Sequence, residues 1–121
     1  MPVSGAVRER IRAFLDEGDE IRYVFPATIP MSVQSSVLVV VSREATTVLS
    51  TGFWSTKMPK SVVARLPRNT VLGPVSTQTT PYFTLDGIDY EIDDEYVAVV
   101  NAADAEIASP QDLPQDPLPD L

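Results

Sequence analysis

The chain has neither cysteine nor histidine among its 121 residues. The lack of cysteine excludes disulfides, cysteine-ligated zinc sites and iron–sulfur clusters. The lack of histidine removes the commonest general acid–base, the usual partner of a nucleophilic serine or cysteine, and the commonest transition-metal ligand. We therefore expect a protein that is not an enzyme and that binds no metal or cofactor.

Basic residues are also scarce, because 9 Lys and Arg stand against 17 Asp and Glu. The formal net charge of −8 opposes nonspecific binding to nucleic acid and adsorption to anionic lipid. No segment approaches the ~20 apolar residues of a transmembrane helix, and residues 1–30 lack the apolar centre of a secretory signal. With the lack of cysteine, these features predict a cytoplasmic protein without a nucleic-acid partner, and they argue against a membrane partner.

Two segments show helical patterns. Residues 5–16 carry an apolar stripe of Val7, Ile11, Phe14 and Leu15 at helical spacing, which predicts a helix packed on the outside of the domain. A partner-binding or membrane-surface role for this helix is the alternative. A second helix is predicted over residues 94–108, because acidic residues open the segment and alanines fill it.

Between the helices the chain reads as extended strands. The apolar run of residues 37–41 and the β-branched run of residues 46–49 predict a buried strand, a tight turn and a partner strand. Period-two alternation predicts a strand over residues 20–28, and Pro26 places that strand at a sheet edge. Shorter strands are predicted at residues 61–66, 82–85 and 88–92, the last two joined by the hairpin turn Asp86-Gly87.

These elements predict a mainly β domain with flanking helices, of the α+β class. We expect a small antiparallel barrel or sandwich of about six or seven strands with a C-terminal helix. An open sheet with both helices on one face is the alternative. Residues 1–108 form the predicted domain, and residues 109–121 form an acidic, proline-rich tail that we expect to be disordered. The tail offers either a peptide motif for a partner or a solubilising extension.

Three segments carry a resemblance to a known family. They read VLVVVSREATTVLSTG, ARLPRNTVLGP, and IDYEI followed by a helix ending NAADA. Their order, over residues 7–105, resembles the bacterial pleckstrin-homology-like (PH-like) domains of actinobacteria. The Asp expected in the Ser42–Glu44 turn is missing, and residues 45–47 are less apolar than in that pattern. The resemblance implies two near-orthogonal sheets closed by the C-terminal helix in an uncharacterised bacterial protein, and it supplies no catalytic residues.

Acidic residues gather near the end of the predicted domain: Asp86, Asp89, Glu91, Asp93, Asp94 and Glu95. Carboxylates in such a group could bind calcium or magnesium, but their spacing does not match an EF-hand loop. A hairpin turn followed by a helix N-terminus accounts for most of them without an ion.

The function expected from these features is a non-enzymatic interaction domain that binds a protein or peptide. The resemblance implies strand addition or docking in a groove between the helix from Asp94 and the neighbouring strand. The predicted contact residues are Tyr96, Val97 and Val100 on that helix, and Phe53 and Trp54 in a loop. The alternative is binding of anionic lipid headgroups through the basic residues Lys57, Lys60, Arg65 and Arg68.

Overall fold

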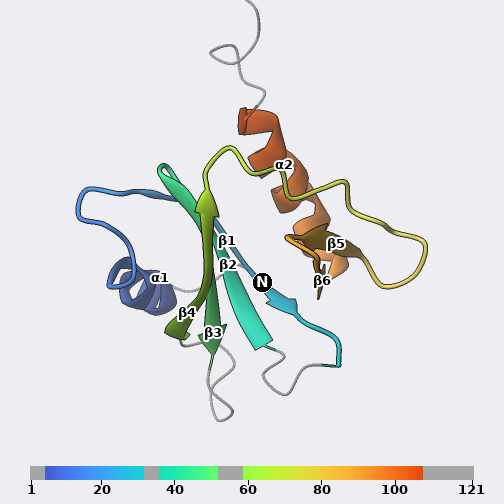
Figure 1. Cartoon of the computed structure of the whole chain (residues 1–121), viewed down its shortest axis with the longest axis horizontal. Helices are drawn as coiled ribbons and strands as arrows, with labels where there is room; N and C mark the ends of the chain where they lie inside the picture. Colours follow the sequence, from blue (N-terminus) through green and yellow to red (C-terminus); the bar gives the residue numbers. More distant parts are fainter. Residues whose placement is uncertain (1–4, 32–35, 52–58, 108–121) are drawn as a thin grey trace, which may run out of the picture.

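The computed structural model describes residues 5–31, 36–51 and 59–107. Within these ranges the chain forms an antiparallel sheet of six strands and two helices (Figure 1). The elements are α1 (Gly5–Arg12), β1 (Ile21–Thr28), β2 (Ser36–Ser42), β3 (Ala45–Thr51), β4 (Pro59–Pro67), β5 (Tyr82–Leu85), β6 (Ile88–Glu91), the 3₁₀ turn η1 (Asp94–Tyr96) and α2 (Val97–Ile107).

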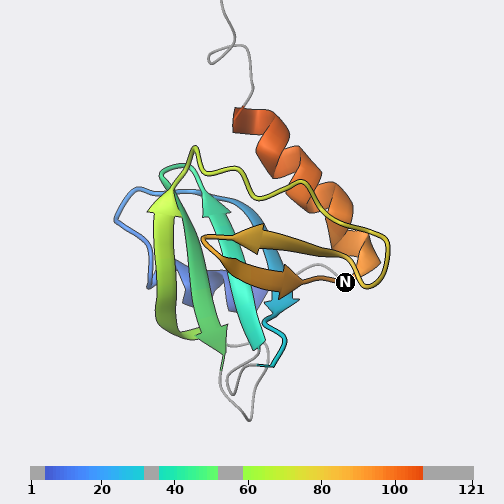
Figure 2. The same cartoon turned by 45° about the vertical axis from the view of Figure 1, so that its right-hand side comes forward.

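The strands lie in the order β4-β3-β2-β1-β6-β5, and the sheet curls strongly so that the β5–β6 hairpin turns over one face (Figure 2). The predicted central pair is confirmed as β2 and β3, which meet in the register Val39↔Val48. Every residue of β3 is buried, because both faces of the sheet are covered at this strand. The expected class, mainly antiparallel β with flanking helices, is confirmed.

The β5–β6 hairpin was predicted from Asp86-Gly87 and is confirmed. Asp86 has φ 55° and Gly87 has φ 82°, and Leu85 pairs with Ile88 across the turn. Consecutive positive φ values fit the tight turns that join strands, and Asp and Gly reach this region at low cost. A two-residue sequence signal therefore fixes the register of the whole hairpin.

Two apolar cores lie on opposite faces of the sheet. The first packs α2 and the β5–β6 hairpin onto one face, with Phe25, Val39, Phe83 and Val100 at its centre. The second packs α1 onto the other face, where Ile11 meets β-strand residues such as Leu38 and Leu49. The prediction that the first helix docks outside the sheet is confirmed, and the alternative with both helices on one face is wrong.

The first helix is shorter than its apolar pattern predicts. Helix α1 ends at Arg12, and Phe14 and Leu15 reach the second core from the turn that follows. The predicted apolar stripe therefore still packs on the sheet, because the side chains of Phe14 and Leu15 face the core although these residues lie outside the helix. The C-terminal helix opens as the 3₁₀ turn η1, and the Asp93 side chain at its N-cap makes no capping hydrogen bond. No helix in the described ranges has the length and apolarity needed to cross a membrane.

Candidate functional site

Among the described residues, one edge of β1 has no partner strand along most of its length. β1 pairs with β2 from Ile21 to Thr28, but it pairs with β6 only at Thr28, opposite Glu91. Among the described strands, none lies along the other side of β1 between Ile21 and Ala27. The predicted edge position of β1 is wrong in the strand order, where β1 lies between β2 and β6, although the described part of β1 pairs with β6 only at Thr28.

Pro26 indicates which backbone groups face the open side. Proline has no N–H, so within a sheet its nitrogen faces away from a partner strand. Backbone groups alternate along a strand, and the N–H and C=O of Val24 therefore face the same open side as the Pro26 nitrogen. Unpaired groups of this kind are a template for another extended segment.

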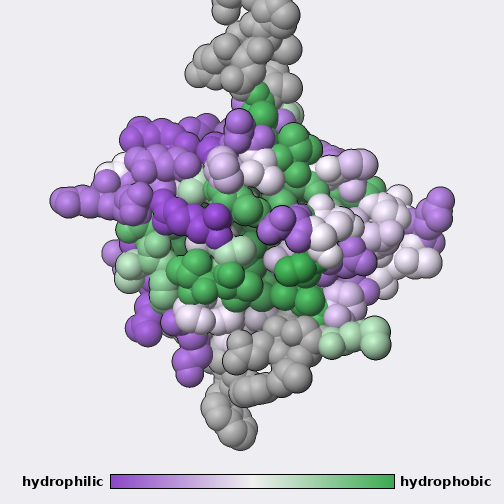
Figure 3. Space-filling view, viewed as in Figure 1, coloured by the Kyte–Doolittle hydropathy of each residue, from purple (hydrophilic) through white to green (hydrophobic). Residues whose placement is uncertain are grey.

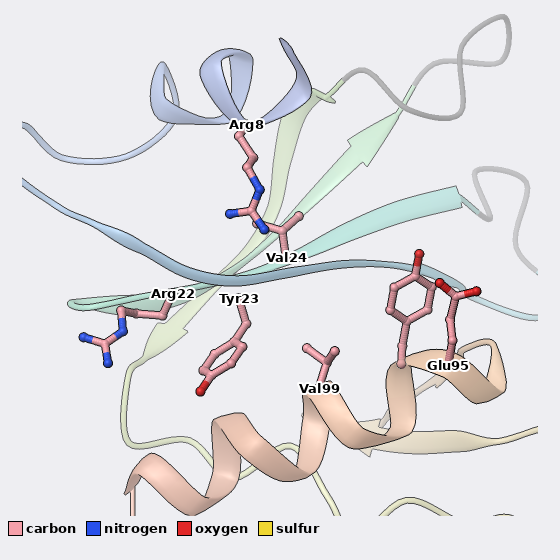
Figure 4. A pocket seen from close by; sticks show the side chains of 7 residues that line it. Arg8, Arg22, Tyr23, Val24, Glu95 and Val99 are labelled. Carbon is pink, nitrogen blue, oxygen red and sulfur yellow. The ribbon is translucent and has the colours of Figure 1, made fainter. Parts of the chain in front are cut away.

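A groove follows this edge. It has a cavity volume of about 280 Å³ and is lined by Arg8 from α1, Arg22, Tyr23 and Val24 from β1, Glu95 and Tyr96 from η1, and Val99 from α2. Figure 4 shows Arg8 reaching from α1 toward Val24, while Val99 approaches from the helix on the other side. Val24 belongs to the core under α1, and Tyr23 packs against the core under α2. A cavity bounded by side chains from both faces of β1 lies at its edge.

The α2 wall of the groove is held by Glu106. Its carboxylate accepts hydrogen bonds from Tyr23 Oη at 2.7 Å and from Arg22 Nη2 and Arg68 Nη2 at 3.1 Å each. The hydrogen bond from Tyr23 is the main reason that the pKa of Glu106 is lowered, and the same bond raises the pKa of Tyr23. Arg68 Nη2 also donates to the Ala103 carbonyl at 3.2 Å, near the helix C-terminus.

An irregularity in β1 lets two successive residues reach Glu106. The register with β2 shifts between Ile21 and Tyr23, which leaves Arg22 as an extra residue. Successive side chains of a regular strand point to opposite faces, but a bulge cancels this alternation locally. Arg22 and Tyr23 therefore both extend toward α2 and define one end of the groove.

The guanidinium group of Arg8 lies at the α1 wall of the groove. Arg8 is half-buried on α1 and has no hydrogen-bond or ion-pair partner among the described residues. By contrast, Arg12 pairs with Glu9 at 2.8 Å on the exposed side of the same helix. A partly desolvated guanidinium beside an open strand edge is suited to a carboxylate or carbonyl on an added segment.

The three predicted contact residues on the C-terminal helix differ in their surroundings and in their burial. Tyr96 lines the groove, although only 6% of its surface is exposed. Val97 is half-buried and packs against the core under α2. Val100 is fully buried in that core, where its side chain packs. Phe53 and Trp54 lie outside the described residues.

The predicted basic cluster does not form one site among the described residues. Arg65 pairs with Asp16 at 3.0 Å on the α1 side of the sheet, whereas Arg68 binds Glu106 and Ala103 on the α2 side. Lys60 is exposed on β4, and Lys57 lies outside the described residues. Each arginine therefore makes intramolecular contacts that stabilise the fold, and the two lie on opposite faces of the sheet.

The acidic residues of the hairpin and η1 are likewise dispersed. Among the described residues, no group of three or more Asp and Glu is placed to hold a metal ion. Asp89 accepts a hydrogen bond from Thr84 Oγ1 across the hairpin at 2.6 Å. Asp86 occupies the turn itself.

The other long edge of the sheet, at β4, is less suited to pairing. Figure 3 shows hydrophobic side chains on the face over β4, where Val62 and Val63 are exposed at 48% and 45%. However, β4 begins and ends with proline and carries two register irregularities against β3. Prolines, bulges and charged residues such as Lys60 and Arg65 are features that protect an edge from further pairing.

Of the residues that line the groove, only Tyr96 is among the contact residues predicted from the sequence. Pro26 was the signal that located the open edge. Arg8 reads from the sequence as part of a solvated helix face, because nothing local shows that α1 lies beside β1. Comparison with known proteins found no matching family model, no similar curated protein and no similar solved structure.

Proposed function

We propose that the protein is a non-enzymatic interaction domain that binds an extended segment of a partner protein along β1. The observation that carries this proposal is the open edge of β1 between α1 and α2. A segment added there pairs with the backbone of β1, and its alternate side chains face the α1 wall and the α2 wall.

The chemistry of the groove favours a peptide over a small molecule. Its walls combine the apolar Val24 and Val99, the aromatic Tyr23 and Tyr96, and the charged Arg8, Arg22 and Glu95. The recognition groups nearest the centre belong to the strand backbone, which pairs with any extended chain. Affinity then comes from main-chain hydrogen bonds, and selectivity comes from the two walls.

We further propose that the fold is related to the PH-like domains. Support comes from the order of the elements, with a helix, a strongly curled antiparallel sheet and a C-terminal helix that follows the last strand. Peptide binding between the C-terminal helix and a strand edge is consistent with this relation. The six described strands lie in one continuous sheet, which is simpler than a pair of orthogonal sheets.

Titration of the isotope-labelled full chain with a short peptide of alternating valine and aspartate tests the binding proposal. We expect saturable changes in the backbone amide signals of Val24 and Phe25 and in that of Val99. We also expect slower hydrogen exchange at the Val24 amide, because its N–H gains an acceptor on the added strand.

The matched control is the same peptide with N-methyl groups on the amides that would face β1. It keeps all side chains but cannot pair with a strand edge, so it should leave the Val24 amide unprotected. Equal binding by both peptides would refute strand addition, and signal changes confined to β4 would place the site at the other edge of the sheet.

A further inference from the structure

Helix α1, which forms one wall of the groove, carries three arginines and one glutamate. Four of the nine Lys and Arg lie between Arg8 and Arg22, in α1 and at the start of β1. Arg8 lines the groove, whereas Arg10 lies exposed on the same helix outside it. Through Arg8, the α1 wall therefore favours a segment with carboxylates on one face.

A segment with that property exists in the same chain. Residues 110–116 read PQDLPQD, with Asp112 and Asp116 and no basic residue. In an extended conformation the two aspartates share one face and Leu113 lies on the other. Such a segment presents carboxylates to the Arg8 wall and an apolar side chain to Val99 on the α2 wall.

The prolines of this segment are spaced to permit pairing on one edge. Pro110 and Pro114 occupy even positions, so the residues that retain an N–H on the opposite edge are Gln111, Leu113 and Gln115. Proline is compatible with an edge strand when its nitrogen faces away from the partner. Pro117 breaks the spacing and ends the run that is able to pair.

The connection to the domain is short enough. α2 ends at Ile107, and the neighbouring Glu106 binds Arg22 and Tyr23 at one end of the groove. The 11 residues of α2 rise about 16 Å, at about 1.5 Å per residue. An extended chain covers that length in about five residues, at about 3.3 Å per residue. Residues 110–116 therefore suffice to return along α2 to Tyr96.

We propose that residues 110–116 of this chain bind in the β1 groove as an added parallel strand and compete there with the partner segment. The inference rests on the proposed function only in naming the same groove. It assigns to the acidic tail the regulation of access to β1, since a partner must displace a covalently attached competitor.

The lack of cysteine makes a direct test possible in the full chain. Leu118→Cys introduces one thiol just beyond the binding segment, and a nitroxide on it broadens the signals of nearby amides. Attachment gives an effective tail concentration on the order of millimolar, so an intrinsic dissociation constant of about 1 mM leaves about half of the molecules docked. We expect at least about a twofold loss of signal at Val24, Phe25 and Val99, with Val62 on β4 unchanged.

Two charge variants make the test specific. Arg8→Glu should restore the signals of Val24 and Val99, whereas the matched Arg10→Glu should not, because Arg10 lies outside the groove. About 1 M salt, where the Debye length is about 3 Å, should also weaken docking. Leu113→Pro should restore the signals without any change of charge, because it removes an N–H from the pairing edge.

The other outcomes each overturn the proposal. Equal broadening in the Arg8→Glu and Arg10→Glu proteins would show that the tail stays near α2 only through its attachment. A further experiment mixes isotope-labelled protein that has no nitroxide with nitroxide-labelled protein that has no isotope label. Broadening in this mixture would assign the occupant to a second copy. An unaffected β1 in a chain that still binds the valine–aspartate peptide would refute tail docking and leave the proposed function intact.

Discussion

Two threonines at the centre of β3 are buried without a visible partner for their hydroxyls. Thr46 and Thr47 have no exposed surface, and their Oγ1 atoms make no hydrogen bond with any described residue. Thr46 shares the face of Val48 under α2, and Thr47 shares the face of Leu49 under α1. Their β-branched shape suits the strand, but a buried hydroxyl without a partner costs free energy.

Replacing one hydroxyl by a methyl group should therefore stabilise the protein. We expect Thr47→Val to raise the free energy of unfolding by about 1 kcal/mol, because the side-chain volume is kept and the unpaired polar group is removed. Urea denaturation measures the change. Thr47→Ser serves as the control and should destabilise the protein, since it keeps the hydroxyl and loses a packed methyl group. A loss of stability in Thr47→Val would show that the hydroxyl is satisfied in solution.

The Asp104 carboxylate of α2 binds the backbone of the long connection between β4 and β5. Asp104 accepts the backbone N–H groups of Leu72 and Gly73, each at 2.8 Å. A Cβ on Gly73 would lie 3.0 Å from Asp104 Oδ2, so a larger residue there would have to displace the carboxylate by a few tenths of an ångström. Leu72 is fully buried under the same helix, and the carboxylate thus fixes the segment that covers one side of the core.

Asp104→Asn tests this attachment. Asparagine has one acceptor oxygen and an NH₂ group, so one of the two backbone N–H groups loses its partner and faces another donor. We expect a loss of about 1–3 kcal/mol in the free energy of unfolding. Asp86→Asn makes the same change of charge in an exposed turn, and Asn also accepts the positive φ of that position. Equal stability of the two variants would contradict the proposed role of Asp104.

The elements that could be predicted from the sequence are those with local signals. The β2–β3 pair follows from its apolar and β-branched runs, and the hairpin follows from Asp86-Gly87. The contacts that shape the groove join residues far apart, such as Tyr23 with Glu106 and Leu72 with Asp104. No local pattern encodes such pairs, because each partner reads alone as an ordinary surface residue. For the same reason, the sequence does not predict that Arg8 and Val99 line the groove. Pro26 is the local signal for an edge in β1.

At the scale of the whole molecule, Glu106 joins three segments that are distant in sequence. It binds the start of β1 through Arg22 and Tyr23, and it binds the connection after β4 through Arg68. All three donors converge on one carboxylate of α2, which therefore adds a polar attachment of this helix to β1 beside their shared apolar core.

Acid should therefore weaken the fold through Glu106. The pKa of Glu106 is lowered in the folded protein from its ordinary value of 4.5, chiefly by the Tyr23 hydrogen bond and further by Arg22 and Arg68. A group with a lowered pKa stabilises the fold fully above its unfolded pKa, and the stabilisation disappears as pH falls through the folded pKa. We expect the free energy of unfolding to fall below about pH 4.5 for this reason.

Glu106→Gln isolates this contribution, because glutamine still accepts the Tyr23 hydroxyl but carries no charge for the arginines. Its side chain is about one-third exposed, so the loss at neutral pH should be modest, about 1 kcal/mol. Below pH 4.5 the two proteins should converge in stability, as measured by urea denaturation across the pH range. The variant should also bind the valine–aspartate peptide more weakly at neutral pH, since a looser α2 leaves the groove less ordered. Parallel stability curves that stay separated in acid would show that Glu106 acts through packing rather than through its charge.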